Sequence, residues 1–181
     1  MEKNRLAINA VAPDFNLPGV DGKNYTLNTF SERSVLVVIF SCNHCPYVKA
    51  YEDRMIALQG EFQNKGVSFV AINANETEHH PEDTFEKMVI RAREKKFNFP
   101  YLRDEDQKVA EGYGAHYTPE IFLLDSKRRL QYTGKIDDNW QQPNEVRVRY
   151  LRDAIVATLA GKPVDSPETH AVGCTIKWAK C

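Results

Sequence analysis

A six-residue run of apolar side chains, from Val35 to Phe40, constrains the fold of this chain more than any other stretch. The run is rich in β-branched residues, which is typical of a strand covered on both faces in a parallel sheet. Shortly after it come Cys42 and Cys45, and beyond them apolar residues recur at helical spacing. The sequence therefore predicts a buried strand, then a turn that carries two cysteines, then a helix.

The two cysteines are three residues apart, and we expect both in the first turn of the helix. This helix is predicted to start near Asn43, to tolerate Pro46 in its first turn and to run to about Asn64. Side chains at positions i and i+3 of a helix share one face, so the two thiols are close enough to form a disulfide. The free N–H groups and the positive dipole end favour Cys42 as the thiolate and lower its pKa by roughly one unit or less.

Two other uses of the cysteine pair stay open. A structural disulfide over so short a loop contributes only about 2 kcal/mol, and a chain of 181 residues can bury an adequate core without it. A zinc or cluster site would add His44 and the tail cysteines to the pair, or use His79 and His80, but no second pair has zinc-finger spacing. We expect no metal and no cofactor, and keep a metal- or cluster-binding protein as the alternative from another class.

Charge and composition restrict the partners. The chain has 24 basic and 25 acidic residues, no basic stripe that would suggest nucleic acid, and no apolar run that would suit a membrane. The first residues lack the apolar core of a secretory signal, so we expect a cytoplasmic protein. The cytoplasm keeps thiols reduced, and there a Cys-x-x-Cys pair is more often catalytic than structural.

The remaining elements alternate between strands and helices. An N-terminal hairpin, with Asp21-Gly22 at its turn, precedes the buried strand. Further strands are predicted at 67–72, 99–102, 118–125 and 129–134, further helices begin at Pro81 and Pro143, and Asp104 caps a short helix through Lys108-Val109-Ala110. This order predicts an α/β fold with a mixed, mostly parallel central sheet, helices on both faces and an antiparallel hairpin at one edge. Residues 1–181 are expected to form one domain, with 162–181 as a tail that packs on or near it.

Four stretches of the chain together resemble a known family. They are Ala12-Pro13-Asp14-Phe15 with Asp21-Gly22-Lys23, the Cys42-Asn43-His44-Cys45 turn, Tyr101-Leu102-Arg103-Asp104 with Tyr113-Gly114, and the run from Thr118-Pro119-Glu120 to Asp125. The arrangement resembles the redoxin branch of the thioredoxin fold, with an N-terminal β-hairpin extension. That branch takes in thioredoxin-like oxidoreductases and the alkyl hydroperoxide reductase/thiol-specific antioxidant family.

The resemblance implies roles for the residues around the turn. Cys42 is the attacking thiol and Cys45 the resolving thiol of a thiol–disulfide oxidoreductase. Pro119 is a cis proline packed against the pair, and the Thr118 backbone holds an extended substrate strand. The implied partners are a disulfide-containing protein or small thiol as substrate, and a thiol reductant. Asn43, His44 and Glu120 are expected to tune the site or bind substrate.

His44 sets the expected redox poise of this pair. Its imidazole is expected to add positive charge or a hydrogen bond to the Cys42 thiolate. Because stabilising the thiolate stabilises the reduced form, we predict a reduction potential less negative than that of thioredoxin.

Two positions depart from the thioredoxin pattern. Leu36 replaces the buried acid that accepts the proton of the resolving thiol, and Ser41 replaces the usual tryptophan. Glu120 or Lys49 is the candidate for the missing proton acceptor. The Pro-x-x-x-Thr-x-x-Cys run of peroxiredoxins is absent before Cys42, so a thiol-dependent peroxidase is the alternative rather than the first choice.

Two further cysteines lie near the end of the chain. Cys174 and Cys181 are candidate auxiliary thiols, either free in the tail or forming a relay with the Cys42–Cys45 pair. The tail around Cys174 is similar to the end of some redoxin-branch proteins, where it would fold back on the domain.

Overall fold

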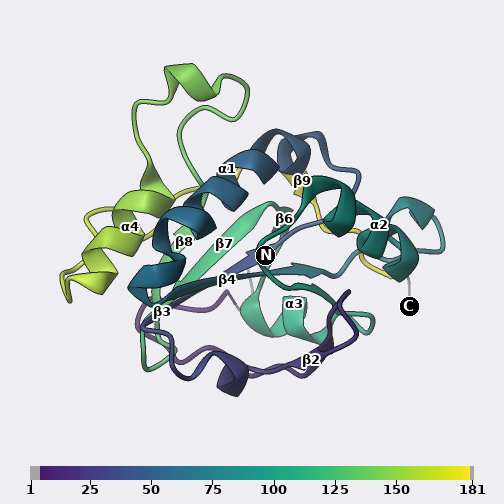
Figure 1. Ribbon diagram of the computed structural model, residues 1–181, viewed down its shortest axis with the longest axis horizontal. Coiled ribbons are helices and arrows are strands. Elements are labelled where there is room, and N and C mark those ends of the chain that lie inside the picture. The colour runs from purple at the N-terminus through teal and green to yellow at the C-terminus, as the bar shows by residue number, and fades with distance from the viewer. Residues whose placement is uncertain (1–4, 180–181) are drawn as a thin grey trace.

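The structure, a computed structural model, describes residues 5–179 and is built around a five-stranded sheet (Figure 1). The sheet has the order β5-β4-β3-β7-β8. Its strands are β3 (Val35–Phe40), β4 (Val67–Asn73), β5 (Tyr101–Arg103), β7 (Glu120–Leu124) and β8 (Leu130–Gly134). β3 pairs in parallel with β4, and β4 with β5, whereas β7 lies antiparallel to β3 and β8 antiparallel to β7. The mixed sheet with an antiparallel hairpin edge is therefore confirmed, but the sheet is not mostly parallel, because β7 also runs antiparallel to the central β3.

The predicted central strand occupies the middle of this sheet. All six side chains of β3 are fully buried, because neighbouring strands flank it on both edges and packed layers cover both of its faces. Val35, Val37 and Ile39 face one apolar cluster, and Leu36 and Phe40 face the other. Because successive side chains of a strand point to opposite faces of the sheet, this one apolar run contributes to two separate cores.

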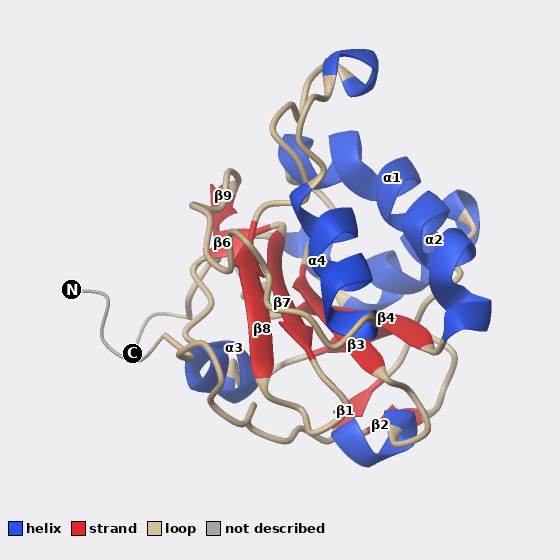
Figure 2. Cartoon of the chain, turned by 90° about the vertical axis from the view of Figure 1, so that its left-hand side faces the viewer, coloured by secondary structure: helices blue, strands red, loops and turns tan. Residues whose placement is uncertain are grey.

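Helices cover both faces of the sheet, as predicted (Figures 1 and 2). One cluster holds residues of α1 (Pro46–Phe62), α2 (Phe85–Lys95) and α4 (Tyr150–Leu159). The opposite cluster holds α3 (Lys108–Tyr113) together with the N-terminal segment, which includes the short hairpin β1 (Leu17–Pro18) and β2 (Asn24–Tyr25) and the 3₁₀ turn Leu27–Phe30. The carboxyl ends of β3, β4 and β5 meet at one edge of this layered structure.

The first long helix begins later than predicted. α1 starts at Pro46 rather than near Asn43, and Cys45 is its N-cap residue with an extended ψ of 124°. The reason is local, because the proline ring disfavours helical backbone in the residue before it. After α1 a 3₁₀ turn at Gln63–Lys65 leads to Gly66, whose φ of 80° suits a residue without a Cβ. Only Cys45, therefore, lies at the helix tip.

Two other helix starts also differ from prediction. A 3₁₀ turn at Pro81–Asp83 precedes α2, and Thr84, with its ψ of 154°, separates the two. Another 3₁₀ turn, Pro143–Glu145, is separated from α4 by an extended segment. The backbone of this extended segment forms a hydrogen bond with the loop that follows β8 and not with a helical turn of its own, since the Asp138 N–H donates to Val148 O at 3.2 Å.

The C-terminal tail folds back along the sheet. The Thr133 N–H of β8 donates to Pro167 O, and the Ile176 N–H donates to His116 O. Between these contacts, β9 (Cys174–Thr175) pairs antiparallel with β6 (Tyr117–Thr118), and Figure 2 shows the two strands side by side. Among residues 5–179, no helix has the length and apolar character needed to span a bilayer.

Candidate active site

Cys42 and Cys45 lie together where β3 ends and α1 begins. The turn is anchored to the sheet by the Ser41 N–H, which donates to Ile72 O at 2.8 Å. Cys42 and Cys45 are both free thiols, lie in one apolar cluster, and each shifts the pKa of the other. Only 2% of Cys42 and none of Cys45 is exposed. The pair thus stands at the carboxyl end of a central strand, where open α/β sheets commonly bind ligands.

Thr118 and Pro119 flank this pair from the other side. The Thr118–Pro119 peptide bond is cis, as the family resemblance implies. The Thr118 hydroxyl oxygen is 3.5 Å from Cys42 Sγ, and the Thr118 carbonyl oxygen is 3.2 Å from Cys45 Sγ. One residue therefore contacts both sulfurs.

Asp83, in the 3₁₀ turn before α2, is fully buried and bonds to the cysteine turn. Its carboxylate accepts the Asn43 N–H at 2.6 Å and lies 2.6 Å from His44 Nδ1. The side-chain amides of Asn73 and Asn75 donate to it as well, at 3.2 and 2.8 Å. A carboxylate with four hydrogen-bonding partners pins the two residues between the cysteines.

Asn43 holds the turn without touching a sulfur atom. Its side-chain amide donates to Glu82 O at 2.8 Å, and its carbonyl oxygen accepts the Tyr101 hydroxyl at 2.9 Å. Sequence reasoning predicted Asn43 and His44 at the site but missed Asp83. The available signal was polar Asn73 and Asn75 directly behind a buried strand, at the same sheet edge as the cysteines.

The electrostatics of the two thiols are the reverse of the prediction. Hydrogen bonding to Cys45, burial and the nearby Asp83 carboxylate all raise the pKa of Cys42. The Cys42 thiol, the Cys174 thiol and the Val48 N–H of the first helical turn together lower the pKa of Cys45 to about 4. The directions of these shifts favour Cys45 as the more acidic thiol of the pair, chiefly through hydrogen bonding with Cys42.

His44 does not supply an isolated positive charge. Its ring is paired with the buried Asp83, and it stacks on His80 with ring centroids 5.6 Å apart. His80 in turn lies against Glu76, which also accepts the His79 N–H at 3.0 Å. The two adjacent histidines are thus loop residues that share one acidic partner.

Three potential metal ligands approach one another at the turn. A sulfur, a ring nitrogen and a carboxylate oxygen from Cys42, His44 and Asp83 lie within 4.8 Å of one another. However, both oxygens of Asp83 already bind amide or imidazole groups, with Asn73 on one and Asn75 on the other. A cation at this place would have to compete with those hydrogen bonds.

Neither residue suggested for proton handling lies at the sulfurs. Lys49 is exposed. Glu120 is fully buried, but its carboxylate accepts the His116 and Tyr117 N–H groups at 2.7 and 3.0 Å and forms an ion pair with Arg5 at 2.9 Å. Glu120 therefore shapes the loop before Thr118. The acid next to the thiols is Asp83.

The tail brings one more cysteine to the site. In the β6–β9 pair, Cys174 is opposite Thr118, and its side chain packs against the apolar cluster that contains Cys42 and Cys45. Burial and the neighbouring Cys45 thiol raise the pKa of Cys174 to about 11. Cys181 lies outside the described residues.

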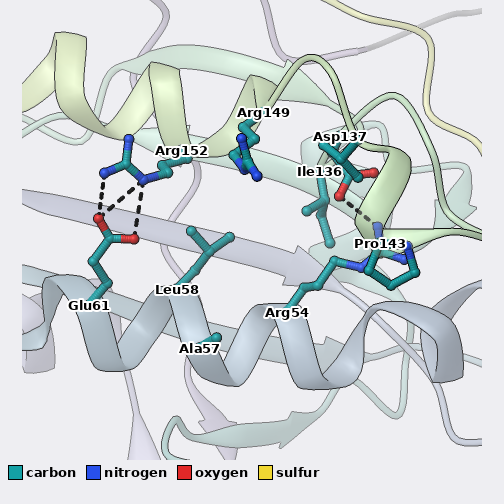
Figure 3. A pocket seen from close by; sticks show the side chains of 10 residues that line it. Arg54, Ala57, Leu58, Glu61, Ile136, Asp137, Pro143, Arg149 and Arg152 are labelled. Atoms are coloured by element: carbon teal, nitrogen blue, oxygen red, sulfur yellow. Dashed lines mark hydrogen bonds and ion pairs between the residues drawn. The ribbon is translucent and has the colours of Figure 1, made fainter.

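A pocket of about 290 Å³ lies between α1 and α4 and contains no cysteine (Figure 3). Two of its arginines are already paired, since Arg54 lies 2.6 Å from Asp137 and Arg152 lies 2.6 Å from Glu61. It is separate from the thiol site.

Residues 8–133 match the model of the AhpC/TSA family. The chain belongs to the AhpC/TSA family. The predicted resemblance is thereby confirmed, and this redoxin is an oxidoreductase enzyme. The match covers both cysteines of the turn and the cis proline, and ends just before the segment that leads to α4.

Curated relatives of this AhpC/TSA family member have two kinds of name. It is 24% identical over 132 residues to thiol-disulfide oxidoreductase ResA of Geobacillus thermodenitrificans, covering 72% of this chain and 70% of the relative. It is 27% identical over 136 residues to a 1-Cys peroxiredoxin of Dictyostelium discoideum, covering 71% of this chain and 56% of that one.

Solved structures place its fold among the thioredoxins. A hypothetical protein from Sinorhizobium meliloti superimposes with a TM-score of 0.92 at 36% identity, over 98% of both chains. A putative thiol:disulfide interchange protein DsbE from Chlorobium tepidum gives a TM-score of 0.68 at 21% identity, over 85% of this chain and 99% of that one. The predicted thioredoxin fold is therefore confirmed.

Proposed function

We propose that the chain is a thiol–disulfide oxidoreductase that uses Cys42 and Cys45 as its redox dithiol. The observation that carries this proposal is that two free thiols both lie against Thr118, beside the cis Pro119. Two sulfurs this close together at the end of β3 need little movement to form a disulfide. Names of the ResA relatives support the same chemistry.

Cys42 is the attacking sulfur in this proposal, because it keeps slight exposure and Cys45 has none. The proton of Cys42 passes to the neighbouring Cys45 thiolate. The Cys42 thiolate then attacks one sulfur of the substrate disulfide, the substrate S–S bond breaks, and the other substrate sulfur leaves as a thiolate.

Resolution by Cys45 completes the exchange. The Cys45 proton moves to the departing substrate thiolate, and the Cys45 thiolate attacks the Cys42 sulfur. The mixed disulfide breaks, the second substrate thiol is released after taking a proton from water, and a Cys42–Cys45 disulfide remains. The substrate is reduced by two electrons and the dithiol is oxidised by two, so a thiol reductant must restore it.

His44 and Asp83 position the attacking sulfur. Asp83 holds the His44 ring and the Asn43 N–H, and so fixes the turn between the two cysteines. Its negative charge keeps the proton on Cys42 until substrate arrives. Attack by Cys42 thus depends on transfer of its proton to Cys45, which links the two thiols in one catalytic unit.

Trapping of mixed disulfides tests this proposal. In a Cys45→Ser variant, Cys42 should capture a model disulfide such as oxidised glutathione and hold it, because no resolving thiol remains. Mass spectrometry should find glutathione on Cys42. The matched Cys42→Ser variant should lose disulfide reductase activity by about a hundredfold or more. Turnover by Cys42→Ser at the rate of the unaltered protein would rule the proposal out.

A thiol-dependent peroxidase is a second candidate, favoured by the peroxiredoxin among the relatives. Residues 35–42 contain no proline or threonine, so the usual peroxidatic sequence is missing. Peroxide consumption in the presence of a dithiol reductant separates the two functions. Peroxide turnover faster than reduction of a disulfide substrate would favour the peroxidase.

A further inference from the structure

We propose that Cys174 is a third redox thiol of this site, and that Cys45 exchanges its disulfide partner between Cys42 and Cys174. The inference rests on the proposed dithiol function and extends it to the C-terminal tail. It assigns β9 as a built-in strand at the edge where the family resemblance implies an extended substrate.

Backbone pairing fixes the position of Cys174. β9 lies antiparallel to β6, and the register places Cys174 opposite Thr118, the residue whose carbonyl oxygen is 3.2 Å from Cys45 Sγ. Directly after the strand the tail is held as well, since the Ile176 N–H donates to His116 O at 2.8 Å. The β6–β9 pairing therefore fixes the position of the Cys174 thiol next to the Cys42–Cys45 pair.

Gly173 allows this close approach. A Cβ at this position would lie 2.1 Å from Thr118 O and 2.7 Å from Thr118 C, both rigid backbone atoms beside the cis bond. Any other side chain would force the tail away from β6. The residue before Cys174 is thus the one that lets its strand contact the active-site loop.

Cys45 is the middle sulfur of three. It lies in one apolar cluster with Cys42, both of the other thiols shift its pKa, and it is completely buried. Cys174 is only half-buried and packs against the same apolar cluster. A disulfide that moves from Cys42–Cys45 to Cys45–Cys174 therefore moves from a sealed place toward solvent.

The exchange step balances without an added oxidant. Starting from the Cys42–Cys45 disulfide, the sulfur of Cys174 attacks Cys45, the Cys42–Cys45 bond breaks, and a Cys45–Cys174 bond forms. The proton of Cys174 ends on Cys42, whose pKa is raised by burial and by Asp83. One thiol and one disulfide are present before and after, and an external thiol then reduces the more exposed disulfide.

Cross-linking in a chain with two cysteines tests the proposal directly. A Cys42→Ser/Cys181→Ser variant retains only Cys45 and Cys174, and is equilibrated in a glutathione redox buffer. We expect an intramolecular Cys45–Cys174 disulfide, identified by peptide mapping with mass spectrometry. Glutathione adducts on both thiols without that cross-link would overturn the proposal. Circular dichroism establishes that the variant is folded, and a Cys42→Ala version replaces it if it is not.

Two controls test whether the cross-link depends on the position of Cys174 in β9 or only on free movement of the tail. Adding Gly173→Val retains both thiols but displaces the strand, and should slow the cross-link by about tenfold or more, because proximity is lost. The Cys45→Ser/Cys181→Ser variant carries Cys42 and Cys174, and should cross-link about tenfold more slowly than the Cys45–Cys174 pair. Equal rates in all three proteins would contradict an assignment based on the strand register.

A further variant keeps this test independent of the proposed function. Cys174→Ser/Cys181→Ser retains only the Cys42–Cys45 pair. If this pair forms a reversible disulfide but Cys45 and Cys174 do not, the dithiol function stands and the third thiol is rejected. If Cys42–Cys45 fails to form, the proposed function itself is wrong.

Discussion

At the scale of single residues, Pro46 decides which sulfur is activated. Proline keeps Cys45 extended, so α1 begins at Pro46 and Cys45 becomes its N-cap. Cys42 stays in the preceding turn beside the buried carboxylate of Asp83. Hydrogen bonding with Cys42 and the N–H groups of the helix tip therefore lower the pKa of the proposed resolving cysteine, and the acid helps to raise the pKa of the attacking one.

Titration of the thiolate checks this assignment. Reduced protein should show thiolate ultraviolet absorbance at neutral pH that disappears on acidification, because the pKa of Cys45 is lowered to about 4. A Cys45→Ser variant should lose this signal, and a Cys42→Ser variant should keep it. If Cys42→Ser abolishes the signal and Cys45→Ser does not, the assignment is wrong.

Substitution of Asp83 should change reactivity and stability in opposite directions. Asp83→Asn removes the negative charge that raises the pKa of Cys42, so alkylation of Cys42 at neutral pH should become several-fold faster. Loss of the charged acceptor for Asn43 and His44 should cost about 2 kcal/mol of unfolding free energy.

Glu82→Gln provides the control for Asp83, because Glu82 contacts the turn through its backbone carbonyl. Its alkylation rate and urea midpoint should match those of the unaltered protein. An Asp83→Asn variant that behaves in the same way would show that the buried charge has no influence on Cys42.

At the scale of elements, short turns and strands position the groups around the thiols more than the long helices and strands do. The turn after β3, the 3₁₀ segment Pro81–Asp83 and the two-residue strands β6 and β9 carry most of the polar groups around the thiols. Glu120 is an example, because it begins β7 but its carboxylate accepts the N–H groups of His116 and Tyr117. It fixes the loop that leads to Thr118.

Removing that carboxylate should destabilise the whole domain. Glu120→Ala leaves two backbone N–H groups and the Arg5 guanidinium without their acceptor in a buried place, at a cost of about 3 kcal/mol. Glu105→Ala also removes a carboxylate paired with arginine, but the side chain of Glu105 is 75% exposed, so the cost should stay within about 1 kcal/mol. Urea unfolding of both variants measures the difference, and similar losses would refute the argument.

At the scale of the whole molecule, the state of the thiols couples to stability. Between about pH 4 and pH 9 the folded dithiol holds one proton, whereas the unfolded chain holds two. Stability of the reduced protein should therefore rise with pH through this window, as the lowered pKa of Cys45 predicts. Above about pH 9 the unfolded thiols ionise while Cys42 and Cys174 keep their protons, and stability should fall.

Urea unfolding of reduced protein across this pH range tests the coupling. The Cys42→Ser/Cys45→Ser variant is the reference, since it retains every other titrating group of the domain. The difference in unfolding free energy between the two proteins should pass through a maximum near pH 9. A difference that stays flat with pH would contradict a shared proton.

The sequence alone determined the parts that depend on neighbouring residues. The apolar run of β3 predicted a central strand, the cysteine spacing predicted a thiol pair at its end, and family likeness implied the cis Pro119. These features depend on local backbone preference, side-chain period and motif. The start of α1 at Pro46 also follows from sequence alone, because a proline disfavours helical backbone in the residue before it.

Only the tertiary structure decided which distant groups surround the thiols. Asp83 is about forty residues from Cys42 in sequence, and Cys174 far more, yet sheet pairing and the folded tail bring both to the same turn. Burial then converts these contacts into opposite pKa shifts for two thiols that look alike in sequence. Ionisation depends on desolvation and on charges nearby in space, and neither can be read from a linear pattern.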